Sequence, residues 1–427
     1  MKPRSDRTAL SALGRRTAEP PISWLMELAL RRPELISLAA GFTDNATLPV
    51  DAARDLLNEL LGRRRTGEPA LQYGNTTGLP ELRRLSGERL RRLDGAAVRE
   101  PGLYAPGEFL ITHGSQQLLY LLTEILCDPG DIVLLEDPTY FVFLGIAQSH
   151  GLACRGHRLE ADGLDVRQLE ATLAALKRSG QLRRVKMLYL VSYYQNPTGT
   201  TTSLARKAAA LDLLRHYERA AGHRIYLLED AAYRELRFAG DDVPSTLTLP
   251  GATERVIYAS TYSKPFATGV RVGFARLPAA LREAAVRVKG NHDFGTASLL
   301  QHLVARMLAS GRYEAHLDGL RARYAHKAAV MERALRRHFP ADAAWRSPAG
   351  GMYFWATLPP RQTTGTRSRR FRAALERNVL YVPGQLCYAD DPTRPKPDHE
   401  IRLSFGNASL ADIREGIARL GAVLREG

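Results

Sequence analysis

The stretch YASTYSKPFATGVRVG, residues 258–273, organises the rest of the chain. The β-branched and aromatic residues of Val256–Ser260 predict a short buried strand that ends in small hydroxyl side chains. Lys264 follows in a Ser-Lys-Pro step, where Pro265 favours an extended backbone for the lysine. Arg271 comes seven residues after Lys264, inside a second apolar run. The stretch therefore predicts a lysine at a strand end with an arginine nearby.

Lys264 has two interpretations. A lysine held among Thr261, Ser263 and Arg271 suits an imine-forming amine beside a group of anion-binding side chains. Taken alone, such a lysine is about as often a solvated surface residue. The other polar motifs of the chain decide between the two.

Length and composition bound the class of protein. At 427 residues the chain is long enough for two or three domains with a large core. It has no run of about eighteen apolar residues, so we expect no membrane span. Cys127, Cys154 and Cys387 have no metal-ligand spacing and form no even disulfide set. We therefore expect no metal site, and a cytoplasmic, reducing environment.

The net charge of +15 comes from basic residues scattered in pairs and triplets, such as Arg63-Arg64-Arg65. Acidic residues are interspersed, and aromatic side chains do not alternate with the basic ones as they do in a base-stacking surface. We interpret the charge as solvated surface and expect no nucleic-acid partner. The positive field favours the approach of anionic substrates.

Residues 1–21 are basic, contain Ser and Thr, and end in Glu19-Pro20-Pro21. This segment has no apolar core and so does not read as a secretory signal. A transit peptide remains an alternative to the mobile arm that we expect here.

Apolar, strand-like runs alternate with helical patterns from Phe109 onward. This spacing predicts right-handed βαβ units and an α/β fold with a mainly parallel central sheet. The expected strands are Phe109–Thr112, Asp131–Glu136, Met187–Ser192 and Ile225–Leu228, and the expected helices between them are Leu118–Leu126 and Ser203–Ala221.

Polar motifs follow these strands, at the edge where open α/β sheets bind ligands. Gly114-Ser115-Gln116-Gln117 reads as a turn whose free N–H groups bind a phosphate or simply cap a helix. Tyr140 lies flat on an aromatic cofactor or fills core. Asn196-Pro197-Thr198-Gly199 has strong turn chemistry, and its alternative is a plain loop.

The chain becomes helical after Arg271 and then predicts a second, smaller sheet. We expect helices over Ser298–Ser310, Leu320–His338 and Leu410–Arg425, and strands over Gly350–Trp355 and Ile401–Phe405. In the last strand, Arg402 points away from the face that the apolar residues share. A long loop rich in Pro and Asp, Ala389–Glu400, precedes it.

The motifs GSQQ, DPTY, NPTG, EDAAY, SK with an arginine seven residues on, GGM and RLSF occur in this order. Together they resemble the class I aminotransferases of pyridoxal phosphate (PLP) fold type I, nearest to the branch of the 2-aminoadipate and kynurenine aminotransferases. The resemblance covers about Ile22 to Leu424. It implies a large PLP-binding domain over residues 51–295 and a small domain over 296–427. Residues 22–50 would pack on the small domain and the active site.

The resemblance implies a role for each site residue. Lys264 forms the internal aldimine and moves the proton between the substrate and the cofactor. Asp230 pairs with the pyridine nitrogen, because a carboxylate there keeps the ring protonated. Asn196 and Tyr233 hydrogen-bond the phenolic oxygen of the cofactor, and Tyr140 stacks on its ring.

The remaining implied roles concern the phosphate and the substrate. Arg402 binds the substrate α-carboxylate as a fork, with Asn196 assisting and Gly41 lining the pocket. Tyr73 reaches the phosphate of a neighbouring subunit, which implies a homodimer. The phosphate-binding set in the same subunit is Ser115, Gln116, Thr261, Ser263 and Arg271.

Three departures from the family pattern matter for this interpretation. Pro265 and Thr268 replace the usual residues near the lysine. The loop Ala389–Glu400 is unusually long. Trp24 stands where relatives that act on acidic side chains carry an arginine, so we expect a neutral apolar or aromatic amino acid as donor, with 2-aminoadipate still possible. The resemblance implies 2-oxoglutarate as the acceptor.

Two other classes of function use the same fold. A β-lyase, a decarboxylating transaminase or an amino-acid oxidase needs the same cofactor site, because the bond that breaks depends on substrate orientation. A transcription regulator with this fold carries a winged helix in addition, and we expect none in the roughly twenty residues before Ile22.

Overall fold

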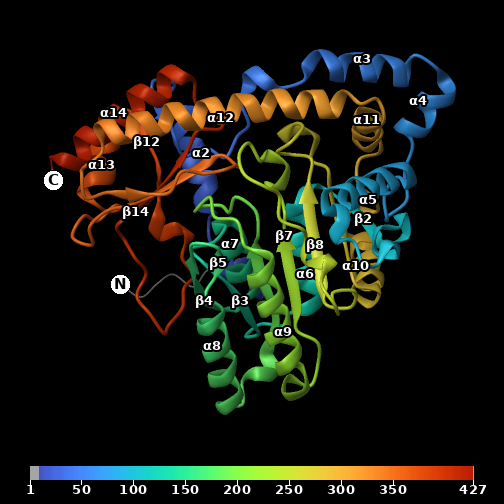
Figure 1. Cartoon of the computed structure of the whole chain (residues 1–427). Coiled ribbons are helices and arrows are strands. Elements are labelled where there is room, and N and C mark those ends of the chain that lie inside the picture. Colours follow the sequence, from blue (N-terminus) through green and yellow to red (C-terminus); the bar gives the residue numbers. More distant parts are fainter. Residues whose placement is uncertain (1–8, 427) are drawn as a thin grey trace.

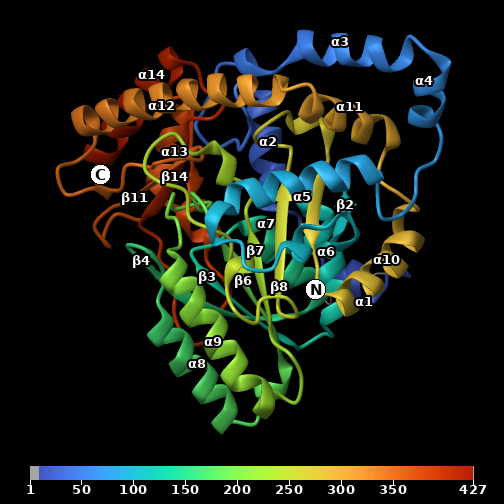
Figure 2. The ribbon, with the colours of Figure 1, turned by 45° about the vertical axis from the view of Figure 1, so that its right-hand side comes forward.

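The computed structural model describes residues 9–426. An eight-stranded sheet lies at its centre, in the order β2-β9-β8-β7-β6-β3-β4-β5, with helices on both sides (Figures 1 and 2). The strands are β2 (Phe109–Thr112), β3 (Ile132–Asp137), β4 (Ala153–Glu160), β5 (Gly163–Leu164), β6 (Val185–Val191), β7 (Tyr226–Asp230), β8 (Val256–Thr261) and β9 (Gly273–Arg276). Strands β4, β3, β6, β7 and β8 are mutually parallel, which confirms the predicted α/β fold.

The stretch 258–273 makes one antiparallel return in this parallel sheet. Strand β9 pairs antiparallel with β8 on one side and with β2 on the other. The amide of Tyr262 donates to the carbonyl of Val272 at 2.9 Å, which closes the return. Lys264 and Arg271 therefore lie on a single loop beyond the carboxyl end of β8.

The large sheet carries helices that include the two predicted over Leu118–Leu126 and Ser203–Ala221, and the first of these needs a correction. They are α5 (Pro80–Asp94), α6 (Gly114–Leu126), α7 (Phe141–His150), α8 (Val166–Arg178), α9 (Leu204–Ala221) and α10 (Ala279–Asp293). The expectation of a turn over Gly114–Gln117 is wrong, because α6 already begins at Gly114. The side chain of Gln117 accepts a hydrogen bond of 2.9 Å from the amide of His113, which satisfies a free N–H at the helix start.

A second sheet of four antiparallel strands has the order β10-β11-β14-β13. Its strands are β10 (Ala344–Trp345), β11 (Tyr353–Thr357), β13 (Val382–Pro383) and β14 (Glu400–Ser404), and its helices are α13 (Arg369–Glu376) and α14 (Leu410–Arg425). The strand expected from Gly350 begins only at Tyr353. Gly351 has a φ of +71°, and a Cβ on Gly350 would lie 2.7 Å from the ring of Tyr194, so the backbone turns closely around that ring.

Helix α12 (Arg312–His338) follows α11 (Ser298–Ala309) and runs along the top of Figure 1. It connects the large unit, which is the eight-stranded sheet with its helices, to the small unit, which is the four-stranded sheet with its helices. It begins at Arg312 rather than at Leu320 as predicted. Tyr313 and Leu317, in the added turns, are buried and extend the apolar face of the helix.

The N-terminal segment contacts both units. Strand β1 (Ile36–Ser37) pairs in parallel with β12 (Val379–Leu380) beside the small sheet. Helix α1 (Ala12–Arg16) lies by α7, where Arg16 Nε donates to the carbonyl of Ser149 at 3.2 Å. The remaining helices are α2 (Pro21–Arg31), α3 (Val50–Leu61) and α4 (Arg64–Leu71). The part of the expected mobile arm at residues 1–8 lies outside the described residues, and the division into domains stays a prediction.

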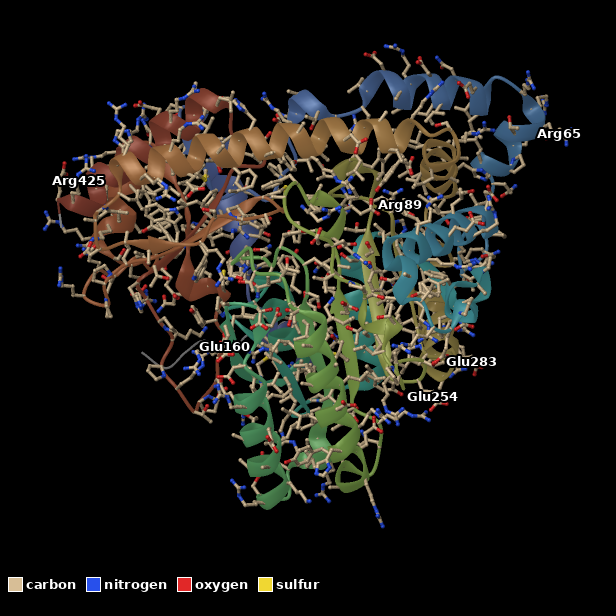
Figure 3. All side chains as sticks on the ribbon, in the orientation of Figure 1. Arg65, Arg89, Glu160, Glu254, Glu283 and Arg425 are labelled. Carbon is tan, nitrogen blue, oxygen red and sulfur yellow. The ribbon has the colours of Figure 1, made fainter. Side chains whose placement is uncertain are left out.

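Charged side chains project from the periphery of the molecule, with Arg65 and Arg425 at opposite ends (Figure 3). This distribution is that of a solvated surface. Among residues 9–426, no helix combines the length and the apolar character needed to cross a membrane.

Candidate active site

The carboxyl ends of β3, β6, β7 and β8 meet at one edge of the large sheet, and a cavity lies there. In a parallel sheet this edge collects the loops that follow each strand. Most of the predicted cofactor site lies together on this cavity. Its lining residues are Ser115, Gln116, Tyr140, Val191, Asn196, Asp230, Ala232, Tyr233, Thr261, Ser263, Lys264 and Arg271.

Lys264 projects across this cavity to the N-terminal segment. Its Nζ donates a hydrogen bond of 2.7 Å to the carbonyl of Gly41. Burial, together with the positive charges of Arg271 and Arg402, lowers the pKa of the Lys264 amine to about 8. A substantial fraction of this amine is therefore neutral and nucleophilic near neutral pH.

Asp230 is the last residue of β7 and is buried. Its carboxylate accepts hydrogen bonds from Tyr189 Oη at 3.0 Å and from the amide of Ala232 at 3.1 Å. No arginine, lysine or histidine pairs with it in the described part of the chain. Burial raises its pKa to about 6. A buried carboxyl group without a cationic partner fits the protonated ring nitrogen of pyridoxal phosphate.

The opposite end of the cavity suits a phosphate. Ser115 and Gln116 lie in the first turn of α6, where backbone N–H groups are free and the helix dipole favours an anion. Arg271 Nη1 donates to Ser263 Oγ at 3.1 Å, which places the guanidinium beside this turn. A Cβ on Gly273 would lie 2.6 Å from the carbonyl carbon of Gly114, so β9 and the start of α6 can approach only with glycine there.

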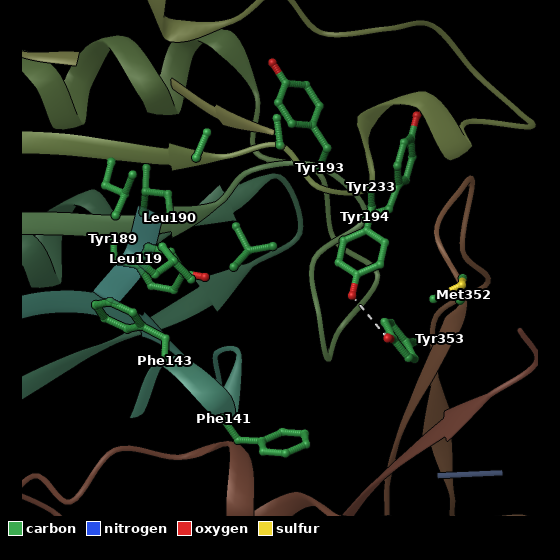
Figure 4. Close-up of a cluster of buried hydrophobic side chains, with 14 of the residues drawn as sticks. Leu119, Phe141, Phe143, Tyr189, Leu190, Tyr193, Tyr194, Tyr233, Met352 and Tyr353 are labelled. Atoms are coloured by element: carbon green, nitrogen blue, oxygen red, sulfur yellow. Dashed lines mark hydrogen bonds between the residues drawn. The ribbon is translucent and has the colours of Figure 1, made fainter. Parts of the chain in front are cut away.

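Tyr233 and Asn196 lie side by side in the cavity wall. Asn196 Nδ2 is 3.4 Å from Tyr233 Oη, which in turn hydrogen-bonds to Tyr353 Oη at 3.1 Å (Figure 4). Burial raises the pKa of Tyr233 well above its usual value, so its hydroxyl keeps a proton to donate. Tyr353 was not among the predicted site residues, although its place in the Gly350-Gly351-Met352-Tyr353 stretch was a usable signal.

Arg402 enters from β14 of the small sheet and is only 1% exposed. Its Nη1 donates to Asn196 Oδ1 at 2.7 Å and its Nη2 to the carbonyl of Ala39 at 2.6 Å. Its Nε has no partner in the described structure, and no carboxylate pairs with the guanidinium. The guanidinium lies 4.4 Å from the ring centroid of Tyr353 and 5.3 Å from that of Phe141. A buried arginine without an anionic partner is suited to bind a carboxylate.

Four predicted site residues are not on the cavity lining: Gly41 and Arg402 hydrogen-bond to residues that are, whereas Tyr73 and Trp24 pack elsewhere. Tyr73 is 83% exposed, and its ring packs edge-on against Phe294 with centroids 5.4 Å apart. Trp24 on α2 contacts Phe371 of α13, with ring centroids 5.9 Å apart. This contact holds Trp24 against the small sheet unit, so a role in substrate binding has no contact to support it here.

The long loop Ala389–Glu400 docks on the large sheet rather than standing free. The amide of Ala389 donates to Asp137 Oδ1 at 3.2 Å, and Arg394 forms an ion pair with the same carboxylate. The amide of Gly156 donates to Asp391 Oδ2 at 3.2 Å. The loop therefore fastens the residues before Arg402 to the end of β3 and the middle of β4.

Comparison with known proteins agrees with this site. The family model described as aminotransferase class I and II matches residues 33–420, so the chain belongs to this family, whose members are PLP-dependent enzymes that transfer amino groups. The chain is 33% identical to the 2-aminoadipate transaminase of Thermus thermophilus, over all of this chain and 98% of that one.

Two further relatives are named for other substrates. The aromatic-amino-acid aminotransferase 1 of Thermococcus litoralis is 30% identical, over 97% of this chain and 93% of the relative. The solved structure of the kynurenine aminotransferase of Pyrococcus horikoshii superposes with a TM-score of 0.87 at 30% identity, over 98% of this chain and 97% of that one.

Proposed function

We propose that this aminotransferase moves the amino group of a neutral apolar or aromatic L-amino acid to 2-oxoglutarate. The observation that carries the proposal is the position of three groups: the amine of Lys264 and the carboxyl of Asp230 line one cavity, and the guanidinium of Arg402 is hydrogen-bonded to Asn196 in its wall. Among the described residues, neither Asp230 nor Arg402 has an ionic partner. An amine, a proton-holding carboxyl and a carboxylate receptor are the parts that amino transfer requires.

The residues around the cavity would hold the cofactor as follows. When bound, pyridoxal phosphate supplies a ring that accepts electrons from the α-carbon of the amino acid. Asp230 would keep a proton on the ring nitrogen, and Arg271 with the first turn of α6 would bind the phosphate. Asn196 and Tyr233 would donate hydrogen bonds to the phenolic oxygen.

Lys264 would then carry the proton. Its amine, with a pKa lowered to about 8 chiefly by burial, can accept a proton from the substrate α-carbon near neutral pH and return it. Tyr353 supports the arrangement through its hydrogen bond of 3.1 Å to Tyr233. In this structure the amine donates to the carbonyl of Gly41 at 2.7 Å.

Arg402 would bind the α-carboxylate shared by every donor and acceptor. Its Nε has no partner in the described structure, and its Nη1 donates to Asn196 Oδ1, a residue of the cavity wall. A fork of charge-assisted hydrogen bonds would fix the α-carbon relative to Lys264.

The aromatic surroundings of Arg402 support an apolar or aromatic donor. Phe141 and Tyr353 flank the guanidinium, and Arg271, the single arginine on the cavity lining, belongs to the phosphate end. The names of the relatives point in two directions, since one acts on 2-aminoadipate and another on aromatic amino acids. We therefore keep 2-aminoadipate as a second donor to be measured.

We also propose that the active unit is a homodimer and that the protein is cytoplasmic. Leu71, Tyr73 and Phe294 are large apolar residues with exposed fractions of 70%, 83% and 58%, which suits an interface. The three cysteines are free, which fits a reducing compartment.

A panel of amino donors with 2-oxoglutarate tests the proposed function. We expect the oxo acids of leucine, phenylalanine, tyrosine or kynurenine, with equimolar glutamate. If 2-aminoadipate clearly outcompetes these donors, the proposed side-chain preference is wrong. If ammonia, carbon dioxide or peroxide appears and no amine reaches an oxo acid, the lyase, decarboxylase or oxidase alternative replaces amino transfer.

A further inference from the structure

Gln195 directly precedes Asn196 and has no role in the chemistry above. Every donor and acceptor position of its side-chain amide nevertheless has a hydrogen-bond partner. It is 1% exposed, and its Nε2 donates to Glu136 Oε2 at 3.1 Å and to the carbonyl of Pro138 at 2.8 Å. Its Oε1 accepts from the amide of Thr198 at 2.9 Å and from Thr198 Oγ1 at 2.7 Å. A side-chain amide has two donors and two acceptor positions, so all four are occupied.

Glu136 Oε2 accepts one of the hydrogen bonds from Gln195. Glu136 lies on β3 and is fully buried. Its Oε2 also accepts from the amide of Val191 at 2.8 Å, at the end of β6. No basic side chain pairs with it in the described residues, and burial raises its pKa to about 8. Its Oε2 therefore serves as a buried hydrogen-bond acceptor shared by two loops' donors, Val191 and Gln195, away from solvent.

The contacts of Gln195 join two loops that carry site residues. Pro138 belongs to the loop after β3 and lies two residues before Tyr140, whereas Thr198 belongs to the loop after β6 and lies two residues after Asn196. Because β3 and β6 are neighbouring parallel strands, both loops leave the sheet at the same edge. The amide of Gln195 thus fixes the position of one loop relative to the other.

Asn196 extends this connection to the substrate side of the cavity. Its Oδ1 accepts from Arg402 Nη1 at 2.7 Å, and its Nδ2 lies 3.4 Å from Tyr233 Oη. A shift of the Asn196 backbone would therefore move the guanidinium of Arg402 and remove a donor from the cavity wall.

We propose that Gln195, anchored by Glu136, is a positioning residue that sets Asn196 and Tyr140 relative to each other and through Asn196 orients Arg402. The proposal rests on the proposed function for the ligands that Arg402 and Asn196 receive. A residue that only stabilised the fold would leave substrate binding and the cofactor environment unchanged, and this difference can be measured.

The central variant is Gln195→Met, which keeps the length of the side chain and removes its hydrogen bonds. We expect KM for the donor and KM for the 2-oxo acid to rise together by about tenfold, because both depend on Arg402. We also expect the pH titration of the bound cofactor's absorbance to move to higher pH, since the phenolic oxygen loses a well-placed donor. This spectral readout does not depend on turnover.

Two variants of Glu136 distinguish the effect of side-chain shape from the effect of its hydrogen bonds. Glu136→Gln keeps an acceptor for Val191 and Gln195 and should retain the wild-type KM and absorbance titration. Glu136→Met should shift both in the same direction as Gln195→Met. The double variant Gln195→Met/Glu136→Met should change KM by less than the sum of the two single effects. Both substitutions break the same hydrogen-bond network, so their effects are not independent.

Tyr104→Phe is the matched control for a loss of stability alone. It removes one buried hydrogen bond, from Tyr104 Oη to Asp94 at 2.7 Å, elsewhere in the large unit. It should lower the melting temperature and leave KM and the absorbance titration unchanged. The proposal is overturned if Gln195→Met behaves like this control.

Two further outcomes are decisive. If Gln195→Met does not fold, Thr198→Val removes the hydroxyl that donates to Gln195 Oε1 and accepts from the amide of Thr200 at 3.3 Å. It should give the same two shifts at smaller size, and unchanged values there would refute the proposal. If wild-type protein shows no cofactor absorbance or transfers no amine, the proposed function fails instead. That result is seen before any variant is made.

Discussion

Asn196 Oδ1 accepts a hydrogen bond of 2.7 Å from Nη1 of Arg402, and this contact joins the large sheet to the small one at the candidate site. Asn196 stands after β6, and Arg402 stands in the middle of β14, 206 residues further along the chain. The second fork nitrogen of Arg402 is bound to the carbonyl of Ala39 at 2.6 Å. The guanidinium is thus held from both sides before any substrate carboxylate arrives, which reduces the entropy lost on binding.

Arg402→Lys should damage every substrate alike. Lysine keeps the positive charge but cannot form the planar fork, so the contact to Asn196 or the contact to the substrate is lost. We expect kcat/KM for each donor and each acceptor to fall by about 30- to 1,000-fold, which corresponds to roughly 2–4 kcal/mol. Steady-state kinetics across the donor panel measures this. A loss confined to one donor would show that Arg402 contacts a side chain rather than the α-carboxylate.

Arg276→Lys provides the control for this variant. Arg276 is also only 1% exposed, and its Nη1 donates to the carbonyl of Thr253 away from the cavity, at 2.6 Å. The change should lower the melting temperature without altering KM for any substrate. A similar rise in KM would mean that the effect of Arg402→Lys is structural.

The sequence predicted the parts of this site that each lie at the end of a strand. Asp230, Asn196 and Lys264 each follow an apolar run, and the parallel arrangement of those runs brings their ends to one edge. Such residues can be found because strand pattern and βαβ order are local signals. The start of α6 was missed by four residues, because Gly-Ser-Gln-Gln has turn chemistry and the Gln117 cap is visible only in the structure.

Contacts between distant segments could not be predicted in the same way. The hydrogen bond between Tyr233 and Tyr353 and the contact of Lys264 with Gly41 depend on how the two sheets sit against each other. Nothing in the local pattern around Trp24 indicates that its ring packs on Phe371 of the small sheet unit. Tertiary packing decided all three.

The amine of Lys264 should react as a weak base in cofactor-free protein. Burial first, then the charges of Arg271 and Arg402, lower its pKa from 10.5 to about 8. Because only the neutral amine is nucleophilic, competitive labelling with acetic anhydride should reach half of its maximal rate near pH 8. Mass spectrometry of the Lys264 peptide gives the profile.

Arg271→Met checks the cause of this reactivity. Removing one nearby positive charge should move the labelling profile of Lys264 to higher pH. An ordinary lysine profile in the wild-type protein would instead place Lys264 outside the buried cavity.

Asp230→Asn should stabilise the cofactor-free protein and disable the enzyme. Burial raises the pKa of Asp230 from 3.8 to about 6, so between these values the folded protein holds a proton that the unfolded chain releases. Stability therefore falls as pH rises through this window, and the variant escapes the loss. At pH 7 we expect a gain on the order of 1–3 kcal/mol in the free energy of unfolding, measured by denaturant titration.

Activity should show the opposite effect of the same substitution. An amide cannot keep the ring nitrogen protonated, so we expect kcat to fall by about 100-fold or more. The stability difference should also disappear below about pH 3, where the carboxyl is protonated in both states. If the two proteins are equally stable at every pH, the Asp230 carboxyl is either exposed to solvent or paired with a cation, and this prediction is wrong.

Tyr73 should act across a subunit boundary. In this chain it is 83% exposed and packs on Phe294 rather than on the cavity, so it has no contact with its own phosphate site. If its hydroxyl reaches the phosphate in a partner, Tyr73→Phe should weaken cofactor binding, whereas Lys264→Ala should remove activity. A hybrid dimer of the two variants then has one site that lacks both groups and one site with both intact.

Mixing Tyr73→Phe with Lys264→Ala therefore shows whether Tyr73 serves the partner's site or the site of its own subunit. We expect hybrid dimers, purified by two affinity tags, to regain about half of the wild-type activity at limiting cofactor, since one of two independent sites is complete. If Tyr73 served its own subunit, each hybrid site would lack one group and no activity would return at that cofactor concentration. Sedimentation equilibrium of the wild-type protein supplies the independent check, because a fully active monomer would contradict any shared site.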